Sequence, residues 1–79
     1  MQRQVVIEEP VSLSLGKYLA DSEGLTRVLE AIDALAHDPY PADSVPWGRL
    51  MRRMHIGPYR VLYEIEETTI RVRRVDRVL

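Results

Sequence analysis

Apolar and polar residues alternate along the middle of the chain in two short runs that meet at Gly57 and Pro58. Branched and aromatic side chains favour strands, and a Gly-Pro pair between two such runs is typical of a turn. If the turn holds only these two residues, His55 lies opposite Arg60, because successive side chains on a strand alternate between faces. The pattern therefore predicts a hairpin over residues 52–63, with apolar side chains on one face and a basic cluster on the other: Arg53, His55 and Arg60.

A third apolar run follows the hairpin and extends it into a predicted meander of three strands. A two-residue turn between the second and third strands places Glu64 opposite Arg71 and Leu62 opposite Arg73. The alternation slips after Arg73, because Val75 would otherwise fall on the polar face. We expect a β-bulge or the end of the strand at this point. The three predicted strands cover about residues 49–56, 59–66 and 69–75.

The first half of the chain combines one strand pattern with helical periodicity. Residues 5–7 are a continuous apolar run, which favours a strand in the interior of a sheet. Residues 11–19 fit the spacing of either a strand or a helix, and we expect a helix. From the capping residue Asp21, apolar side chains recur at helical spacing as far as Ala36, which predicts a second helix. Prolines at the end of this helix and up to residue 46 then indicate a loop.

The predicted elements follow one another in the order β-α-α-β-β-β, which defines an α+β fold in a single domain over residues 1–79. We expect both helices to cover the apolar face of a largely antiparallel four-stranded sheet. The opposite face is then left open and carries mostly charged side chains: Met51, Arg53, His55, Arg60, Leu62, Glu64, Arg71 and Arg73.

Composition narrows the classes of protein that this fold can serve. The chain has 79 residues and no cysteine, which excludes disulfide bonds and thiolate metal sites. Its two histidines are far apart in the sequence, and we predict neither a metal site nor a cofactor. The N-terminus lacks the pattern of a signal peptide, and no apolar stretch approaches the length of a membrane span. A soluble, cytoplasmic protein is therefore expected.

The net charge of −1 conceals an asymmetry between the two halves of the chain. Acidic residues dominate residues 1–46, whereas the strand-rich remainder carries eight arginines against four acidic residues. The planar guanidinium group suits bidentate binding of a phosphate or a carboxylate. A cluster of arginines on one sheet face is thus a candidate anion site, although charged runs also occur as solvated faces.

Several segments together carry a resemblance to a known family. They are the strand Val5-Val6-Ile7-Glu8, the helix of residues 29–35 followed by Asp38-Pro39, and the segment of residues 53–65, RMHIGPYRVLYEI. With the final strand, they span nearly the whole chain. In these features the sequence resembles the RelE/ParE superfamily of toxins from bacterial toxin–antitoxin systems.

The resemblance implies a RelE-like fold and a cognate antitoxin protein as partner. The expected assembly is a homodimer of this chain or a heterotetramer that it forms with the antitoxin. RelE-type members cut mRNA at the ribosome, so the leading expectation is a metal-independent endoribonuclease that binds RNA through its basic sheet face. ParE-type members share the fold but poison DNA gyrase and lack the nuclease residues, which makes them the alternative. A degenerate member that binds only its antitoxin is a third hypothesis.

Carried over by position, the RelE-type basic set implies particular site residues. His55 is the group in the cluster that titrates near neutrality, so it is the candidate acid or base. RelE-type chains typically continue past this arginine to a Tyr or His, whereas Val78 and Leu79 follow Arg77 here. The candidate RNA-binding arginines also have Glu64 and Glu66 within reach as ion-pair partners. The predicted catalytic set is Arg53, His55, Arg60 and Arg77, and the predicted RNA-binding set is Arg71, Arg73 and Trp47.

Overall fold

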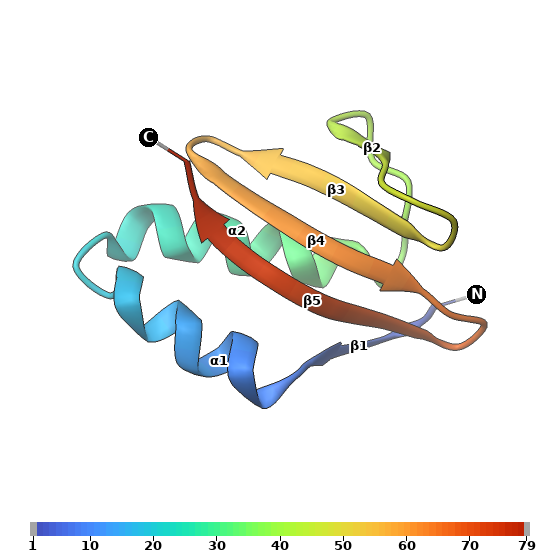
Figure 1. Ribbon diagram of the computed structural model, residues 1–79, viewed down its shortest axis with the longest axis horizontal. Coiled ribbons are helices and arrows are strands. Elements are labelled where there is room, and N and C mark those ends of the chain that lie inside the picture. The colour runs from blue at the N-terminus through green and yellow to red at the C-terminus, as the bar shows by residue number, and fades with distance from the viewer. Residues whose placement is uncertain (1, 79) are drawn as a thin grey trace.

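A computed structural model describes residues 2–78 and places two helices on one face of a five-stranded sheet (Figure 1). The strands lie in the order β1-β5-β4-β3-β2, in which β1 runs parallel to β5 and the other neighbours are antiparallel. This is the predicted α+β architecture. The elements are β1 (Gln4–Ile7), α1 (Glu9–Leu15), a 3-10 turn (Gly16–Tyr18), α2 (Ser22–Ala34), β2 (Ser44–Pro46), β3 (Met51–Ile56), β4 (Tyr59–Ile65) and β5 (Thr69–Arg77).

The predicted hairpin is confirmed in its register. His55 of β3 lies opposite Arg60 of β4, on either side of a turn at which Gly57 adopts a positive φ of 57°. The positive φ favours glycine here, because a Cβ atom would be strained in that conformation.

Pairing between β4 and β5 contains the predicted slip, in the form of a bulge. Glu64 lies opposite Arg71 as expected, but Leu62 lies opposite Arg74, so Arg73 is the extra residue. The bulge keeps Val75 in the core, where its side chain is 2% exposed. Beyond the bulge, Asp76 pairs with Arg60 on the open face, and Arg77 pairs with the buried Tyr59 on the helix side.

Both helices form where the sequence indicates. The ambiguous stretch after β1 is the helix α1, which has a proline in its first turn and ends in the 3-10 turn. Helix α2 begins after Asp21, whose carboxylate accepts a hydrogen bond from the Gly24 N–H at 3.1 Å. Within residues 2–78, no helix has the length and apolar character needed to cross a lipid bilayer.

The core lies between the helices and the covered face of the sheet. Val28 and Ile32 of α2 and the following Leu35 are at most 1% exposed, and they pack against the apolar face of the meander. The sheet side chains in this cluster are Met54, Tyr59, Val61, Tyr63, Ile70, Val72 and Val75.

Two expectations about the sheet are wrong. The sheet has a fifth strand, because Ser44–Pro46 of the proline-rich loop pairs with the edge of β3. Three residues are too few to show alternation, and the segment is held by Arg52, whose guanidinium donates to the Ser44 hydroxyl and carbonyl, each at 3.0 Å. Strand β1 lies at an edge and not in the interior. Its apolar run is half-buried, and Val5 and Ile7 pack against the core.

Candidate anion-binding hollow on the open sheet face

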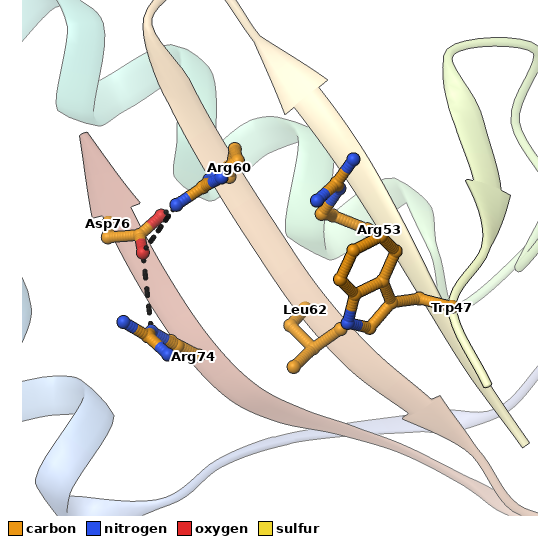
Figure 2. Close-up of a pocket in the computed structure, with 6 residues that line it drawn as sticks. All are labelled: Trp47, Arg53, Arg60, Leu62, Arg74 and Asp76. Carbon is orange, nitrogen blue, oxygen red and sulfur yellow. Dashed lines mark hydrogen bonds and ion pairs between the residues drawn. The ribbon is translucent and has the colours of Figure 1, made fainter. Parts of the chain in front are cut away.

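The open face of the sheet contains a shallow hollow of about 90 Å³ (Figure 2). Alternation along three neighbouring strands brings its lining together, and the loop after β2 adds one aromatic side chain. The lining residues are Trp47 from that loop, Arg53 from β3, Arg60 and Leu62 from β4, and Arg74 and Asp76 from β5.

Asp76 binds two of the three arginines in this hollow. Its carboxylate accepts from Arg60 Nε at 3.1 Å and Nη2 at 3.2 Å, and it lies 3.2 Å from Arg74 Nε. The hydrogen bonds from Arg60 lower the pKa of Asp76 below its ordinary value and raise the pKa of Arg60. The guanidinium fork of Arg60 is therefore already occupied by a carboxylate of its own chain.

Arg53 is in a different situation. Its guanidinium carbon lies 3.9 Å from the centroid of the Trp47 ring, a cation–π contact that Figure 2 shows as the indole lying across the arginine. Its Nε is buried and has no hydrogen-bond acceptor within residues 2–78. A buried donor without an acceptor is unfavourable. Arg53 is therefore the arginine of the hollow at which a further acceptor could bind.

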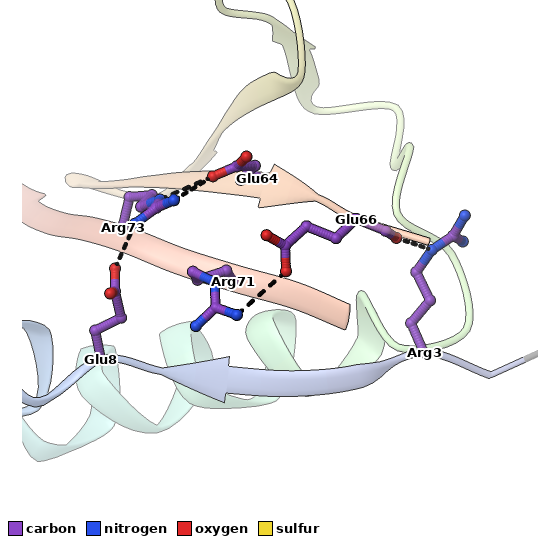
Figure 3. Close-up of polar contacts among 6 residues, drawn as sticks. All are labelled: Arg3, Glu8, Glu64, Glu66, Arg71 and Arg73. Carbon is purple, nitrogen blue, oxygen red and sulfur yellow. Dashed lines mark hydrogen bonds and ion pairs between the residues drawn. The ribbon is translucent and has the colours of Figure 1, made fainter. Parts of the chain in front are cut away.

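The other two arginines of the open face are also in ion pairs (Figure 3). Arg73 donates to Glu64 through Nε at 3.0 Å and to Glu8 through Nη1 at 3.0 Å, and its pKa is raised mainly by the bond to Glu64. Arg71 donates to Glu66 at 3.3 Å. The alternative that these arginines pair with Glu64 and Glu66 is thus the arrangement observed.

Two residues of the predicted catalytic set lie outside the hollow, as do Arg71 and Arg73 of the predicted RNA-binding set. His55 is exposed on the open face at the end of β3, beside Arg60 in the register but not in the lining. The Arg77 guanidinium lies on the helix side, 5.4 Å from the centroid of the Tyr18 ring. The structure therefore brings Arg53, Arg60 and Trp47 together and separates Arg77 from them.

Charge on the open face is nearly balanced. Four of its arginines contact four carboxylates, and Arg53 remains as the one arginine of this face without a carboxylate partner in the described chain. The paired arginines are Arg60, Arg71, Arg73 and Arg74, and their carboxylates are Glu8, Glu64, Glu66 and Asp76.

Sequence reasoning missed Arg74 and Asp76 as members of the hollow. The signal that could have found them is the slip after Arg73, because a bulge returns the following residues to the alternating pattern one position later. Across residues 2–78, His, Asp and Glu side chains do not gather in groups of three that could hold a metal ion.

Comparison with protein families matches residues 13–78 to the ParE toxin of type II toxin–antitoxin system, parDE. The match covers more than half of the chain. Together with the fold, it shows that the chain belongs to this toxin family, within the RelE/ParE superfamily that its sequence resembles. No curated protein matches the sequence significantly.

Solved toxin structures share the fold over almost their whole length. A chain of the toxin–antitoxin complex RelBE2 from Mycobacterium tuberculosis has a TM-score of 0.78 at 26% identity, over 98% of this chain and 92% of that chain. YafQ from E. coli gives 0.77 at 17% identity, over 96% and 93%. The E. coli DinJ–YafQ toxin–antitoxin complex gives 0.80 at 14% identity, over 98% and 93%. Two of these solved structures are toxin–antitoxin complexes.

Proposed function

We propose that this toxin poisons its cell by binding a protein target in the cytoplasm, as ParE-type toxins bind DNA gyrase, and not by cutting RNA. The family match favours this type. The single observation that carries the proposal is the ion pair between Arg60 and Asp76, because it occupies the arginine that RNA cleavage would need for the phosphate.

The chemistry of the hollow supports the same conclusion. Cleavage of RNA without a metal needs one group to take the proton of the ribose hydroxyl and another to protonate the leaving oxygen. Arginines stay protonated and cannot do either. Asp76 has a lowered pKa, so its carboxylate is a weak base at neutral pH. Trp47 and Leu62, the other lining residues, have no proton-transfer group of suitable pKa.

The test is a supercoiling assay with purified toxin, DNA gyrase and relaxed plasmid. We expect the toxin to inhibit supercoiling. The His55→Ala variant should inhibit supercoiling with the same potency as the unchanged chain, because His55 has no chemical step to perform. Full gyrase activity at toxin levels that arrest growth would contradict the proposal. Absence of growth arrest on expression would contradict it as well.

Ribosome-dependent cleavage of mRNA is the second candidate. The observation that favours it is the register of the hairpin, which places the imidazole of His55 directly opposite Arg60 on the open face. In this case His55→Ala and Arg60→Ala would each abolish cleavage of mRNA on ribosomes, whereas Arg27→Gln, on the exposed side of α2, would not. Intact mRNA in an assay in which a known ribosome-dependent toxin cuts would exclude this candidate.

A further inference from the structure

We propose that the hollow is a socket for a single acidic side chain of a protein partner, with Arg53 as the cation that binds it and Trp47 as its wall. The partner that the family supplies is the antitoxin, so the proposal depends on the membership of the chain in the toxin family and not on the identity of the poisoned target.

The charge of Arg53 is not matched by a carboxylate of its own chain within residues 2–78. In the same part of the chain, its buried Nε has no acceptor. Asp76 contacts Arg60 and Arg74 instead, and its strand β5 is separated from β3 by β4. Among the arginines of the open face, its guanidinium is therefore the one left to bind an anionic group from outside the chain.

The size of the hollow suits a single side chain. The hollow has a volume of about 90 Å³. That is the scale of a carboxylate side chain. Sites for drug-sized ligands occupy about 300–1,000 Å³, which excludes a nucleotide enclosed in the hollow.

The neighbouring residues show that this surface already binds a carboxylate. Asp76 lies between Arg60 and Arg74 in the same hollow and is bound in the fork of the former. The indole of Trp47 stacks on Arg53 and is 48% exposed, so it stays available to a partner. An acidic side chain entering beside the indole would complete a second arginine–carboxylate pair next to the first.

An acidic protein segment fits this face better than RNA does. A strand of RNA would bring several phosphates across the sheet, and there it would meet carboxylates that are already paired with arginines. Each additional phosphate would have to displace one of them or lie beside it. The carboxylates of an acidic peptide sit on separate flexible side chains, so one of them can enter beside Arg53 while the others stay in solvent.

The experiment uses the intrinsic fluorescence of Trp47, the one tryptophan of the chain. The whole toxin is titrated with hexaglutamate, with hexalysine as the control of opposite charge and with an RNA hexanucleotide as the competing class. We expect a saturable change in fluorescence with hexaglutamate and none with hexalysine. Tighter binding of the RNA than of hexaglutamate would overturn the proposal.

Matched variants locate the binding. Arg53→Gln should weaken the binding of hexaglutamate by at least about tenfold, as expected for the loss of a charge-assisted hydrogen bond. Arg53→Lys should restore part of the affinity. Arg27→Gln removes the same charge from α2 and should leave binding unchanged. Because the Arg53 variants alter the surroundings of the indole, calorimetry gives the affinities and circular dichroism verifies the fold.

Equal affinity of the Arg53→Gln variant and the unchanged chain, with the fold intact, would overturn the assignment of the socket. The gyrase assay is independent of these titrations. A toxin that fails to inhibit gyrase but binds hexaglutamate through Arg53 would contradict the proposed function and leave the socket standing.

Discussion

At the residue scale, the outcome at each arginine depends on the carboxylate that lies next to it. Arg60 and Arg53 line one hollow and have the same chemistry, yet the former is bound in a fork by Asp76 and the latter is stacked on Trp47 without a carboxylate. The residue type alone therefore does not define an anion site. The site is defined by the cation that remains when internal ion pairs are complete.

The Asp76 carboxylate predicts a pH-dependent contribution to stability. Its pKa in the folded state is lowered from 3.8 by Arg60, so its contribution is fully present above the unfolded pKa of 3.8. It is lost as the pH falls through the lower pKa of the folded state. We expect Asp76→Asn to reduce the free energy of unfolding at pH 7. The difference from the unchanged chain should disappear as the pH falls below the pKa of Asp76 in the folded state.

Urea unfolding at several pH values measures this effect. Asp43→Asn, in an exposed loop, is the matched control and should show no such pattern. A difference between Asp76→Asn and the unchanged chain that is constant with pH would contradict the ion pair.

Tyr63 predicts a second effect at the residue scale. Its hydroxyl is buried and donates to the Pro39 carbonyl at 2.7 Å, which ties the proline-rich loop to β4. Burial raises the pKa of this phenol. Tyr63→Phe leaves the carbonyl without its donor and should lower the free energy of unfolding by about 1 kcal/mol. Tyr40→Phe, on a ring that is 58% exposed, should change it little when both are measured by urea unfolding.

At the element scale, helix α2 is attached to the sheet at its first turn. The Asp21 carboxylate caps the helix through Gly24 and also accepts a hydrogen bond from the Tyr59 hydroxyl at 2.7 Å. Tyr18 packs edge-on against the same ring, with the centroids 5.3 Å apart. One carboxylate thus joins the start of α2 to the first residue of β4, next to the turn of the hairpin.

Gly24 predicts a reversal of the usual effect of alanine in a helix. Replacing glycine by alanine at a compatible helical position stabilises by about 0.4–1 kcal/mol, because the unfolded chain loses freedom. Here a Cβ atom at Gly24 would lie 2.2 Å from Asp21 Oδ2 and 3.0 Å from the Tyr59 ring. We expect Gly24→Ala to lower the free energy of unfolding by about 1–3 kcal/mol, as overpacking does.

Gly16 is the control for this prediction. It has helical φ and ψ, and no heavy atom lies within 4 Å of a Cβ placed there. Gly16→Ala should therefore raise the midpoint of thermal unfolding while Gly24→Ala lowers it. A rise for both variants would contradict the packing of Asp21 and Tyr59 against the first turn of α2.

At the scale of the whole molecule, the open sheet face is nearly neutral although it is rich in arginine. This predicts weak binding of RNA with little dependence on salt. The logarithm of the affinity for a single strand falls with a slope of about −0.7 for each phosphate that is neutralised, so one unpaired arginine gives about −0.7 and five would give about −3.5. Fluorescence anisotropy of a labelled RNA hexanucleotide across a salt series measures the slope.

The same titration with Glu64→Gln is the comparison. This variant releases Arg73 from its closest carboxylate and should make the slope steeper. A steep slope for the unchanged chain would contradict the near balance of charge on the open face, and it would favour RNA as the ligand of that face.

Much of the fold could be predicted from sequence, because it depends on local periodicity. The strands of the hairpin, its two-residue turn and the cap at Asp21 follow from residues that are neighbours in the chain. The site could be predicted only in part. Arg53 and Arg60 share the hollow as expected, whereas Arg77 lies on the other face.

The sequence by itself determined the order of the elements except β2, the parity of the hairpin and the presence of a slip after Arg73, since backbone alternation and turn chemistry are local. Only the tertiary structure decided that the slip is a bulge, that Ser44–Pro46 pairs with β3, and that Asp76 occupies the fork of Arg60. The physical reason is that ion pairs and edge pairing join residues from different strands. Their partners are chosen by the register and by the competition among several nearby carboxylates, and neither is contained in the spacing of residues along the chain.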